Sequence, residues 1–187
     1  ANRVARYADF AQAAPQLLPE HLRSPAFIKR MARDVGAIKQ HEAVIRRFLV
    51  TYPDLIALCH WNANIDNAWF RRDAAGKLQC GLLDWGRVSQ LNLAFALWGC
   101  LSAADLSLWQ AHFGELLDWF VAEYAAHGGP KLDPAELRLH LNLYVALMGL
   151  AWLIDAPALI PRLLPEAMAA SGPTDPLFAT HVGDHRF

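Results

Sequence analysis

Apolar residues recur at helical spacing through the first fifty residues of the chain. A short pattern over residues 3–14 ends at a proline, and a longer one begins at Ser24, directly before Pro25. Serine as N-cap followed by proline at the first helical position is a typical helix start. The apolar positions of this second segment continue to Phe48 at intervals of three and four, with a break allowed at Gly36. Residues 1–50 are therefore predicted to be helical.

The pattern changes between residues 55 and 88. The apolar run LIALC, residues 55–59, predicts a short strand. Two further apolar segments, 67–72 and 78–83, are joined by the turn sequence DAAGK, which predicts a β-hairpin. The second strand of this hairpin leads directly into Asp84-Trp85-Gly86.

Helical patterns return after residue 90. Ser102 and Asp133 stand as N-caps of two long segments, and Gly128 stands as the stop between them. Four helices are predicted, over residues 91–101, 104–127, 133–155 and 158–169, followed by a tail over 171–187. Four tryptophans on apolar helical faces are expected in the core: Trp98, Trp109, Trp119 and Trp152. The predicted fold is a single mainly α (α+β) domain, a helical bundle over 90–170 with one small hairpin.

Composition excludes several classes of partner. The chain has 187 residues, enough for one domain with a core, and a formal charge of −1 with no basic stretch. This balance argues against nucleic acid and against an anionic membrane surface. The most apolar stretch, residues 141–154, falls short of the roughly 20 residues of a spanning helix and predicts a buried core helix. We expect a cytoplasmic protein with three reduced, buried thiols: Cys59, Cys80 and Cys100.

A polar loop follows the predicted strand 55–59. Within six positions it holds three asparagines and one aspartate: Asn62, Asn64, Asp66 and Asn67. Such residues favour turns because their side chains bond to nearby backbone and tolerate left-handed conformations. Their oxygens also suit a cation that binds phosphate. The residues alone therefore leave two alternatives, a capped turn or a ligand-binding loop.

The loop and the hairpin together resemble a known arrangement. His60-Trp61-Asn62, then Asn67, then GLLDWG with Asp84, resemble the catalytic and metal loops of the aminoglycoside phosphotransferase and choline kinase-like family, which shares the protein-kinase fold. The resemblance implies a kinase-like C-terminal lobe in which Asn67 and Asp84 hold the Mg²⁺ that bridges the phosphates of ATP or GTP. It also implies transfer of the γ-phosphoryl group to a hydroxyl of a small molecule.

The chain departs from the family pattern at the catalytic position. Asn62 stands where the family has its catalytic aspartate, and a neutral amide cannot accept the proton of a substrate hydroxyl. Trp61 stands where the family usually has glycine. Asp66 is expected to be an acid that stabilises the loop, with a role as substitute base as the alternative, since it is the only carboxylate in the loop. His60 is expected to support the loop backbone, with direct chemistry as the alternative.

The resemblance covers only the C-terminal lobe. Residues 1–50 contain no strand-rich segment and no glycine-rich loop, so we do not expect an N-terminal nucleotide-binding lobe within residues 1–187. Two functional hypotheses remain. The first is a phosphotransferase with an altered base, in which Asn62 orients the acceptor, and the second is a pseudoenzyme that acts as a binding or regulatory module. A third alternative has no site at all: a structural helical domain in which the motif match is due to chance.

Overall fold

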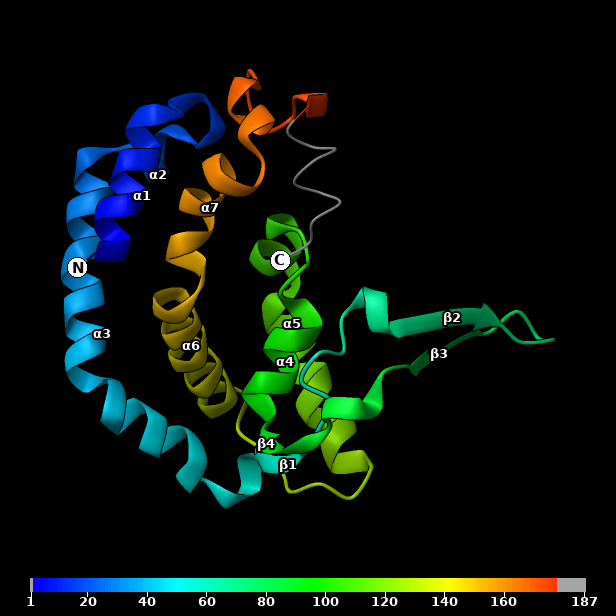
Figure 1. Cartoon of the computed structure of the whole chain (residues 1–187). Coiled ribbons are helices and arrows are strands. Elements are labelled where there is room, and N and C mark those ends of the chain that lie inside the picture. The colour runs from blue at the N-terminus through cyan, green and yellow to red at the C-terminus, as the bar shows by residue number, and fades with distance from the viewer. Residues whose placement is uncertain (1, 178–187) are drawn as a thin grey trace. The chain divides into compact units, whose positions relative to one another are not determined.

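A computed structural model describes residues 2–177, and the fold is mainly helical with two small antiparallel sheets (Figure 1). The mainly α expectation is thereby confirmed. The chain forms two compact units, one from Ala1–Glu42 with Ala146–Phe187 and the other from Ala43–Val145. Residues 178–187 of the predicted tail lie outside the described residues.

The first unit consists of short helices at the two ends of the described chain. Its core is a small cluster of Phe10, Ala14, Leu17 and Ala170. Its elements are α1 (Asn2–Ala13), η1 (Pro15–Leu17), α2 (Glu20–Arg23), the first part of α3 (Pro25–Thr51), the end of α6 (Pro134–Ala151), η5 (Leu153–Asp155), α7 (Ala156–Leu163) and η6 (Pro165–Ala169). The helix predicted over 158–169 is thus two pieces, because the backbone changes direction at Leu164, before Pro165.

The start of α3 follows the predicted capping. Ser24 Oγ accepts a hydrogen bond from the backbone N–H of Phe27, at 3.2 Å. The helix then runs to Thr51 without a break at Gly36. Nothing lies within 4 Å of the position that a Cβ would take at Gly36, so this glycine does not serve a close contact.

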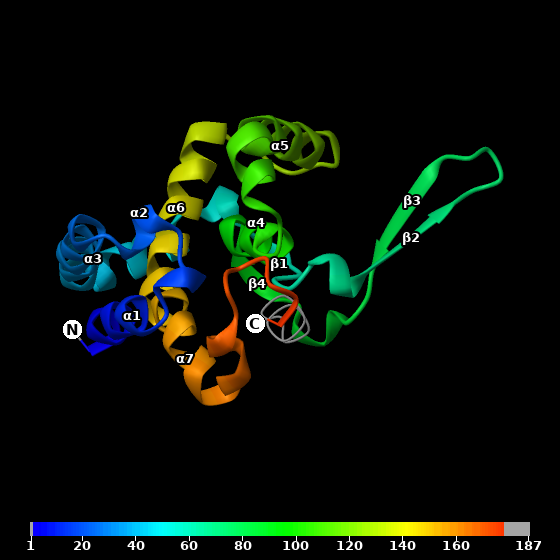
Figure 2. The same ribbon diagram turned by 90° about the horizontal axis from the view of Figure 1, so that it is seen from above.

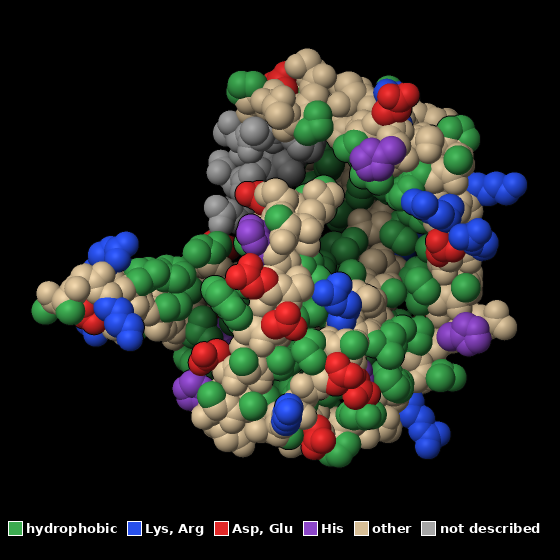
Figure 3. All heavy atoms as spheres, turned by 180° about the vertical axis from the view of Figure 1, so that it is seen from behind, with side chains coloured by type: hydrophobic (Ala, Val, Ile, Leu, Met, Phe, Trp, Pro, Cys, Tyr) green, Lys and Arg blue, Asp and Glu red, His purple; other side chains and the backbone are tan. Residues whose placement is uncertain are grey.

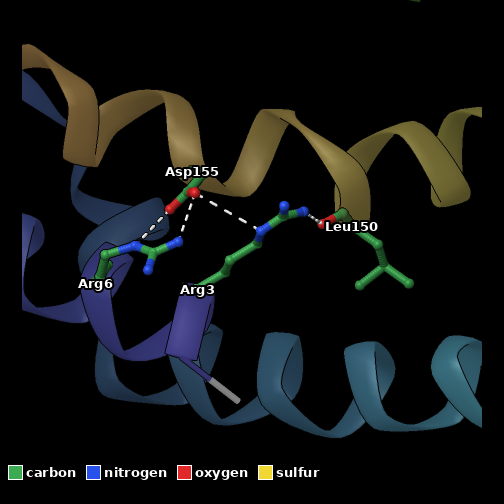
Figure 4. A network of polar contacts seen from close by, with 4 residues as sticks. All are labelled: Arg3, Arg6, Leu150 and Asp155. Carbon is green, nitrogen blue, oxygen red and sulfur yellow. Dashed lines mark hydrogen bonds and ion pairs between the residues drawn. The ribbon is translucent and has the colours of Figure 1, made fainter.

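An ion-pair network joins α1 to the segment between α6 and α7 (Figure 4). Arg6 donates from Nε and Nη2 to the two carboxylate oxygens of Asp155, at 2.7 and 2.5 Å. Arg3 lies 3.7 Å from the same carboxylate and also donates to the carbonyl of Leu150. Leu150 is in the last turn of α6, where carbonyls lack helical partners, so Arg3 satisfies one of them.

The second unit carries both sheets. Strand β1 (Ile56–Cys59) pairs antiparallel with β4 (Ser89–Asn92), with Ile56 opposite Asn92 and Cys59 opposite Ser89. Strand β2 (Ala68–Arg72) pairs with β3 (Leu78–Leu82) in a separate hairpin. A short helical turn, η2 (Pro53–Leu55), precedes β1, and two more lie between the strands: η3 (Ile65–Asn67) and η4 (Trp85–Arg87).

Strand β4 was not predicted, since Ser-Gln-Leu-Asn lacks the branched and aromatic residues typical of strands. The helix expected over 91–101 therefore begins two residues later, as α4 (Leu93–Leu101). Asn92 caps it by accepting from the backbone N–H of Ala94, at 2.9 Å. The Nδ2 of Asn92 donates to the carbonyl of Leu49 and lies 2.9 Å from Nδ1 of the buried His140. Through this amide, the first turn of α4 is tied to α3 and α6.

The core of the second unit lies between β1, α4, α5 (Leu106–Ala126) and the first part of α6. Its buried members are Leu55, Cys59, Leu93, Ala94, Leu97, Leu117, Leu132, Leu137 and Leu141. Ser102 does not cap α5 as predicted, because it ends α4 and Asp105 precedes α5. Gly128 ends α5 as expected, with a φ of +91°.

Two of the four tryptophans expected in the core are exposed. Trp119 is 63% exposed and Trp152 is 53% exposed. Helix α5 is apolar on several sides, so its pattern does not select one buried face. Leu117 is buried, and Phe120, Val121 and Tyr124 pack against the core. Trp119 is one residue before Phe120 and thus about 100° around the helix from it.

The most apolar helical stretch is not a buried core helix throughout. Leu141 and Leu147 are buried, but only 6% of the most apolar 18-residue segment within Pro134–Leu163 is buried. By length and composition alone this is one stretch, among the described residues, that could cross a membrane, which is weak evidence. Of the thiols expected to be buried, Cys59 is buried, whereas Cys80 and Cys100 are exposed, and all three are free.

The β2–β3 hairpin extends from the rest of its unit (Figures 1 and 2). The register places Ala68 opposite Leu82, Phe70 opposite Cys80 and Arg72 opposite Leu78. Because side chains alternate across a strand, these pairs share one face of the hairpin. Figure 3 shows hydrophobic side chains along the hairpin and basic side chains toward its tip. The residues of β2 and β3 are exposed except for Ala68, Gln79, Gly81 and Leu82, which are half-buried.

Candidate functional site

The polar loop and the Asp84 turn are held together at the base of the hairpin. The backbone N–H of Leu83 donates to the carbonyl of Asn67, at 2.8 Å, which extends the β2–β3 ladder by one pair. The Nε2 of His60 lies 2.7 Å from the carbonyl of Leu83, and a carbonyl only accepts, so Nε2 carries the proton. Asn67 and Asp84, which are 17 positions apart, are thereby brought to the same end of the hairpin, since Asn67 pairs with the residue that precedes Asp84.

The backbone fixes the orientation of the Asn64 and Asn62 amides. The backbone N–H of Asp66 donates to Asn64 Oδ1, at 3.1 Å, which identifies that atom as the oxygen. The other end of this side chain, Nδ2, donates to Asn62 Oδ1, at 3.1 Å. Asn62 therefore uses its oxygen inside the loop. Its Nδ2, with two N–H donors, makes no bond within the described part of the chain.

The amide of Asn67 has the opposite orientation. Its Nδ2 donates to the main-chain carbonyl of Asn62, at 2.8 Å. The atom of the Asn67 amide that is left without a hydrogen bond is Oδ1, which is an acceptor and can bind a cation. The two amides of the loop thus present different chemistry, a donor at Asn62 and an acceptor at Asn67.

Asp84 has a left-handed backbone conformation, with φ of 54° and ψ of 57°, and no other non-glycine residue among those described has a positive φ. Such a conformation costs about 1–3 kcal/mol unless the residue is glycine, and it is often retained at functional sites. The carboxylate of Asp84 makes no hydrogen bond that would offset this cost within residues 2–177. It is exposed, and its Oδ1 lies beside Gly86.

A small pocket lies between the loop and the turn. It has a volume of about 30 Å³ and is lined by His60, Trp61, Asn62, Asp84 and Arg87. A volume of this size holds about one water molecule or one ligand oxygen. Three of the predicted site residues, His60, Asn62 and Asp84, therefore share a pocket. Asn67 is not among its lining residues and reaches the pocket wall only through its bond to the Asn62 carbonyl.

Asp66 does not line this pocket. It is exposed, within η3, and its backbone N–H closes the turn against Asn64. The predicted role of Asp66 as a substitute base therefore has no direct support from the pocket geometry.

The pocket rests on α4 and on an aromatic contact. A Cβ at Gly99 would lie 1.5 Å from the main-chain oxygen of Trp61, so the loop backbone passes directly over this glycine. The ring of His60 meets the ring of Trp85 edge-on, with 5.0 Å between centroids. Trp85 Nε1 in turn donates to the carbonyl of Leu82, at 3.0 Å. These contacts set the position of His60 independently of any ligand.

Sequence reasoning missed Arg87, Asn64 and Gly99 as site residues. Arg87 is an exposed guanidinium without an ion pair among the described residues. It lies one short turn after Asp84 and lines the same pocket, but a single arginine in this position gives no spacing pattern in the sequence. Asn64 acts through its side chain, which bonds to the backbone N–H of Asp66 and to Asn62 Oδ1, and Gly99 acts through a backbone contact. Neither contact can be read from the sequence.

The amide oxygen of Asn67 and the carboxylate of Asp84 are oxygen donors of the types that Mg²⁺ binds. No group of three or more His, Cys, Asp or Glu side chains suited to a metal occurs among residues 2–177. Asn67 Oδ1 and the Asp84 carboxylate would supply two oxygens. Mg²⁺ is usually held by one or two protein carboxylates together with waters and substrate phosphates, so two oxygens suffice only when a phosphate ligand is present.

Comparisons with known proteins identify no relative of this chain. No family model matches the chain, and neither the curated proteins nor the solved structures contain a significant match.

Proposed function

We propose that this chain is the C-terminal lobe of a kinase-like phosphotransferase. It uses Mg²⁺ with ATP or GTP and transfers the γ-phosphoryl group to a hydroxyl of a small molecule. Asn67 and Asp84 hold the metal, and the loop from His60 to Asn67 forms the wall against which the phosphates lie.

The observation that supports this proposal is the connection between the polar loop and the Asp84 turn at the base of the hairpin. The Leu83–Asn67 and His60–Leu83 bonds bring the loop and the Asp84 turn together. The Asn67 amide is oriented with its oxygen unbonded, and the Asp84 carboxylate is unbonded in a strained backbone. A purely structural turn would be expected to use these groups internally.

The chemistry of phosphoryl transfer suits such a site. Its loose transition state depends mainly on positioning and on neutralisation of phosphate charge, and less on proton removal. When bound, the metal would supply this neutralisation. His60 keeps the turn in place by donating to the Leu83 carbonyl, and Arg87 adds a positive charge beside Asp84.

A second candidate function is a pseudoenzyme that binds a magnesium nucleotide without turning it over. The observation that favours it is the orientation of Asn62, whose oxygen already accepts from Asn64. An amide in this state offers no base to a substrate hydroxyl. Both candidates share the metal site and differ only in turnover.

The test is nucleotide binding measured by isothermal titration calorimetry, with ATP and GTP, with and without Mg²⁺, on wild type and Asp84→Asn of the full-length protein with any upstream lobe present. We expect magnesium-dependent binding that Asp84→Asn weakens by about tenfold to a hundredfold, because a hydrogen bond or contact with a charged partner is worth roughly 1.5–3 kcal/mol. Asp105→Asn, at the start of α5, removes the same charge outside the site and is the matched control.

Magnesium-dependent binding with measurable turnover supports the phosphotransferase, and binding without turnover supports the pseudoenzyme. Wild type that binds no nucleotide under either condition, or an Asp84→Asn variant that binds as tightly as wild type, rules out both.

A further inference from the structure

We propose that Asn62 and Arg87 form an oxyanion subsite, in which a single phosphoryl oxygen occupies the pocket beside Asp84. This inference rests on the proposed function. It assigns Asn62 to the binding of phosphate through N–H donors, where the resemblance alone assigns it to the hydroxyl acceptor.

The loop itself determines that Asn62 is a donor. The backbone N–H of Asp66 fixes the oxygen of Asn64, and the Asn64 Nδ2 then fixes the oxygen of Asn62. The remaining Nδ2 of Asn62 can only donate, so its partner must be an acceptor. A phosphoryl oxygen, which is negative and has no proton, fits this position better than a hydroxyl that must lose one.

Arg87 supplies the second donor and the charge. Arg87 lines the same pocket as Asn62, and its guanidinium has no ion-pair partner among the described residues. The nearest carboxylate on the pocket wall is Asp84, yet no hydrogen bond or ion pair joins the two side chains in this structure. Arg87 is thus able to bind an anion, and guanidinium groups are well suited to phosphate oxygens.

The size of the pocket limits what it holds. At about 30 Å³ it has room for about one water molecule or one ligand oxygen. The ligand is therefore one corner of a larger anion that lies mainly outside the pocket. Because Asp84 lines the same pocket and repels an anion, a cation on the Asp84 carboxylate is required for the oxygen to enter. Binding at the subsite is thus expected to depend on Mg²⁺.

The test measures affinity for MgATP and for magnesium pyrophosphate by isothermal titration calorimetry on the full chain. Asn62→Asp keeps the oxygen that Asn64 requires and replaces the donor by a negative oxygen. Arg87→Gln removes the charge from an exposed side chain. We expect each variant to bind both probes about tenfold to a hundredfold more weakly than wild type. Arg87→Lys retains the charge and recovers most of the affinity.

Two matched control variants make charge changes of the same sign and size at positions outside the subsite. Gln110→Glu adds a negative charge on α5, and Arg33→Gln removes a positive charge from an exposed position on α3. Both are expected to bind the probes as wild type does. Melting temperatures of all variants check that the fold is retained.

The outcomes separate this inference from the proposed function. If Asp84→Asn loses magnesium-dependent binding while Asn62→Asp and Arg87→Gln bind as wild type does, the subsite is wrong and the metal site remains. If magnesium pyrophosphate binds and depends on Asn62 and Arg87, but no transfer from ATP or GTP is detected, the subsite stands and phosphotransfer fails. Wild type that binds neither probe overturns both.

Discussion

Gly99 of α4 lies so close to Trp61 that a Cβ on residue 99 would fall 1.5 Å from the main-chain oxygen of Trp61. The contact is between two backbones, and neither can move without displacing an element. On one side is the helix that carries Leu97 into the core, and on the other is the loop that leads into Asn62. The position of the pocket therefore depends on a residue with no functional group.

Gly99→Ala is expected to destabilise the second unit and to displace the loop. Overpacking at a tight site costs about 1–3 kcal/mol, and here the clash is with backbone, which relaxes poorly. Urea unfolding measures the change. Gly36→Ala is the matched control, since nothing lies within 4 Å of its Cβ position in α3, and it is expected to stabilise by about 0.4–1 kcal/mol. Equal effects at the two glycines would contradict the close approach at Gly99.

Asp84→Gly is expected to separate stability from function. Glycine adopts the left-handed conformation of residue 84 without strain, and the Asp84 side chain makes no hydrogen bond to lose. The free energy of unfolding should rise by up to about 1 kcal/mol, while magnesium-dependent nucleotide binding disappears. Asp84→Ala also removes the carboxylate but keeps the strain, so it should not be stabilised. The prediction is wrong if Gly and Ala have the same stability.

Asn62→Asp is expected to raise turnover if residue 62 faces the acceptor hydroxyl, as the family resemblance implies, and to lower it if residue 62 faces a phosphoryl oxygen, as the oxyanion subsite requires. One carboxylate oxygen keeps the bond from Asn64, and the other can accept the proton of the substrate hydroxyl. General-base catalysis contributes about 10²–10⁴-fold. Magnesium-dependent hydrolysis of ATP at saturating concentration is the measurement. Asn64→Ala in the Asn62→Asp background removes the bond that orients the new carboxylate and should reduce the gain. No gain at all would favour the pseudoenzyme.

Leu137→Ala is expected to cost about 2–5 kcal/mol of unfolding free energy, because Leu137 is fully buried in the core of the second unit. Trp119→Ala removes a larger side chain that is 63% exposed and should cost much less. Chemical denaturation of both variants compares them directly. A larger loss at Trp119 would mean that this face of α5 is covered by a partner in solution.

The stability of the second unit is expected to fall at acidic pH through His140. Burial lowers the pKa of His140 below its ordinary value of 6.5, although Glu136 acts in the opposite direction. A lowered pKa means that the unfolded chain binds the proton more readily than the folded one. The stabilisation is therefore present above about pH 6.5 and is lost as the pH falls toward the folded pKa.

The structural reason lies in the Asn92 contact. His140 Nδ1 accepts from Asn92 Nδ2, and a proton on Nδ1 would place two donors against each other. Denaturation at pH 7.5 and pH 5.0 of wild type and His140→Gln isolates this effect from the other histidines. A pH dependence that is the same in both proteins would exclude His140 as its source.

The sequence predicted the elements whose signals are local. The hairpin was predicted from two apolar segments around Asp73 and Gly76, and α3 from the Ser24-Pro25 start. Strand β4 was missed because its order comes from pairing with β1, across more than 30 residues, and from the cap that Asn92 gives α4. Trp119 was misplaced because α5 is apolar on several sides, and only its partners decide which side is buried.

The candidate site shows the same division. The spacing of Asn62, Asn67 and Asp84 was readable along the chain, since a hairpin brings its two ends together. The orientation of the amides was not readable, because it depends on which backbone N–H reaches Asn64. Arg87 was passed over because a single arginine after a turn has no spacing pattern of its own.

The hairpin has a further consequence for how the chain tolerates change. Its tip is organised by Asp73, whose Oδ1 accepts from the backbone N–H groups of Ala75 and Lys77, so the turn is complete in itself. Residues inserted between 73 and 77 would lengthen the tip and leave the pair of Asn67 with Leu83 in place. Deletion of one residue from β2 or β3 would instead shift the register and turn Asp84 to the opposite face. The relative position of the two proposed metal ligands therefore depends on the length of the strands. The tip does not affect it and can accept a tag or a label.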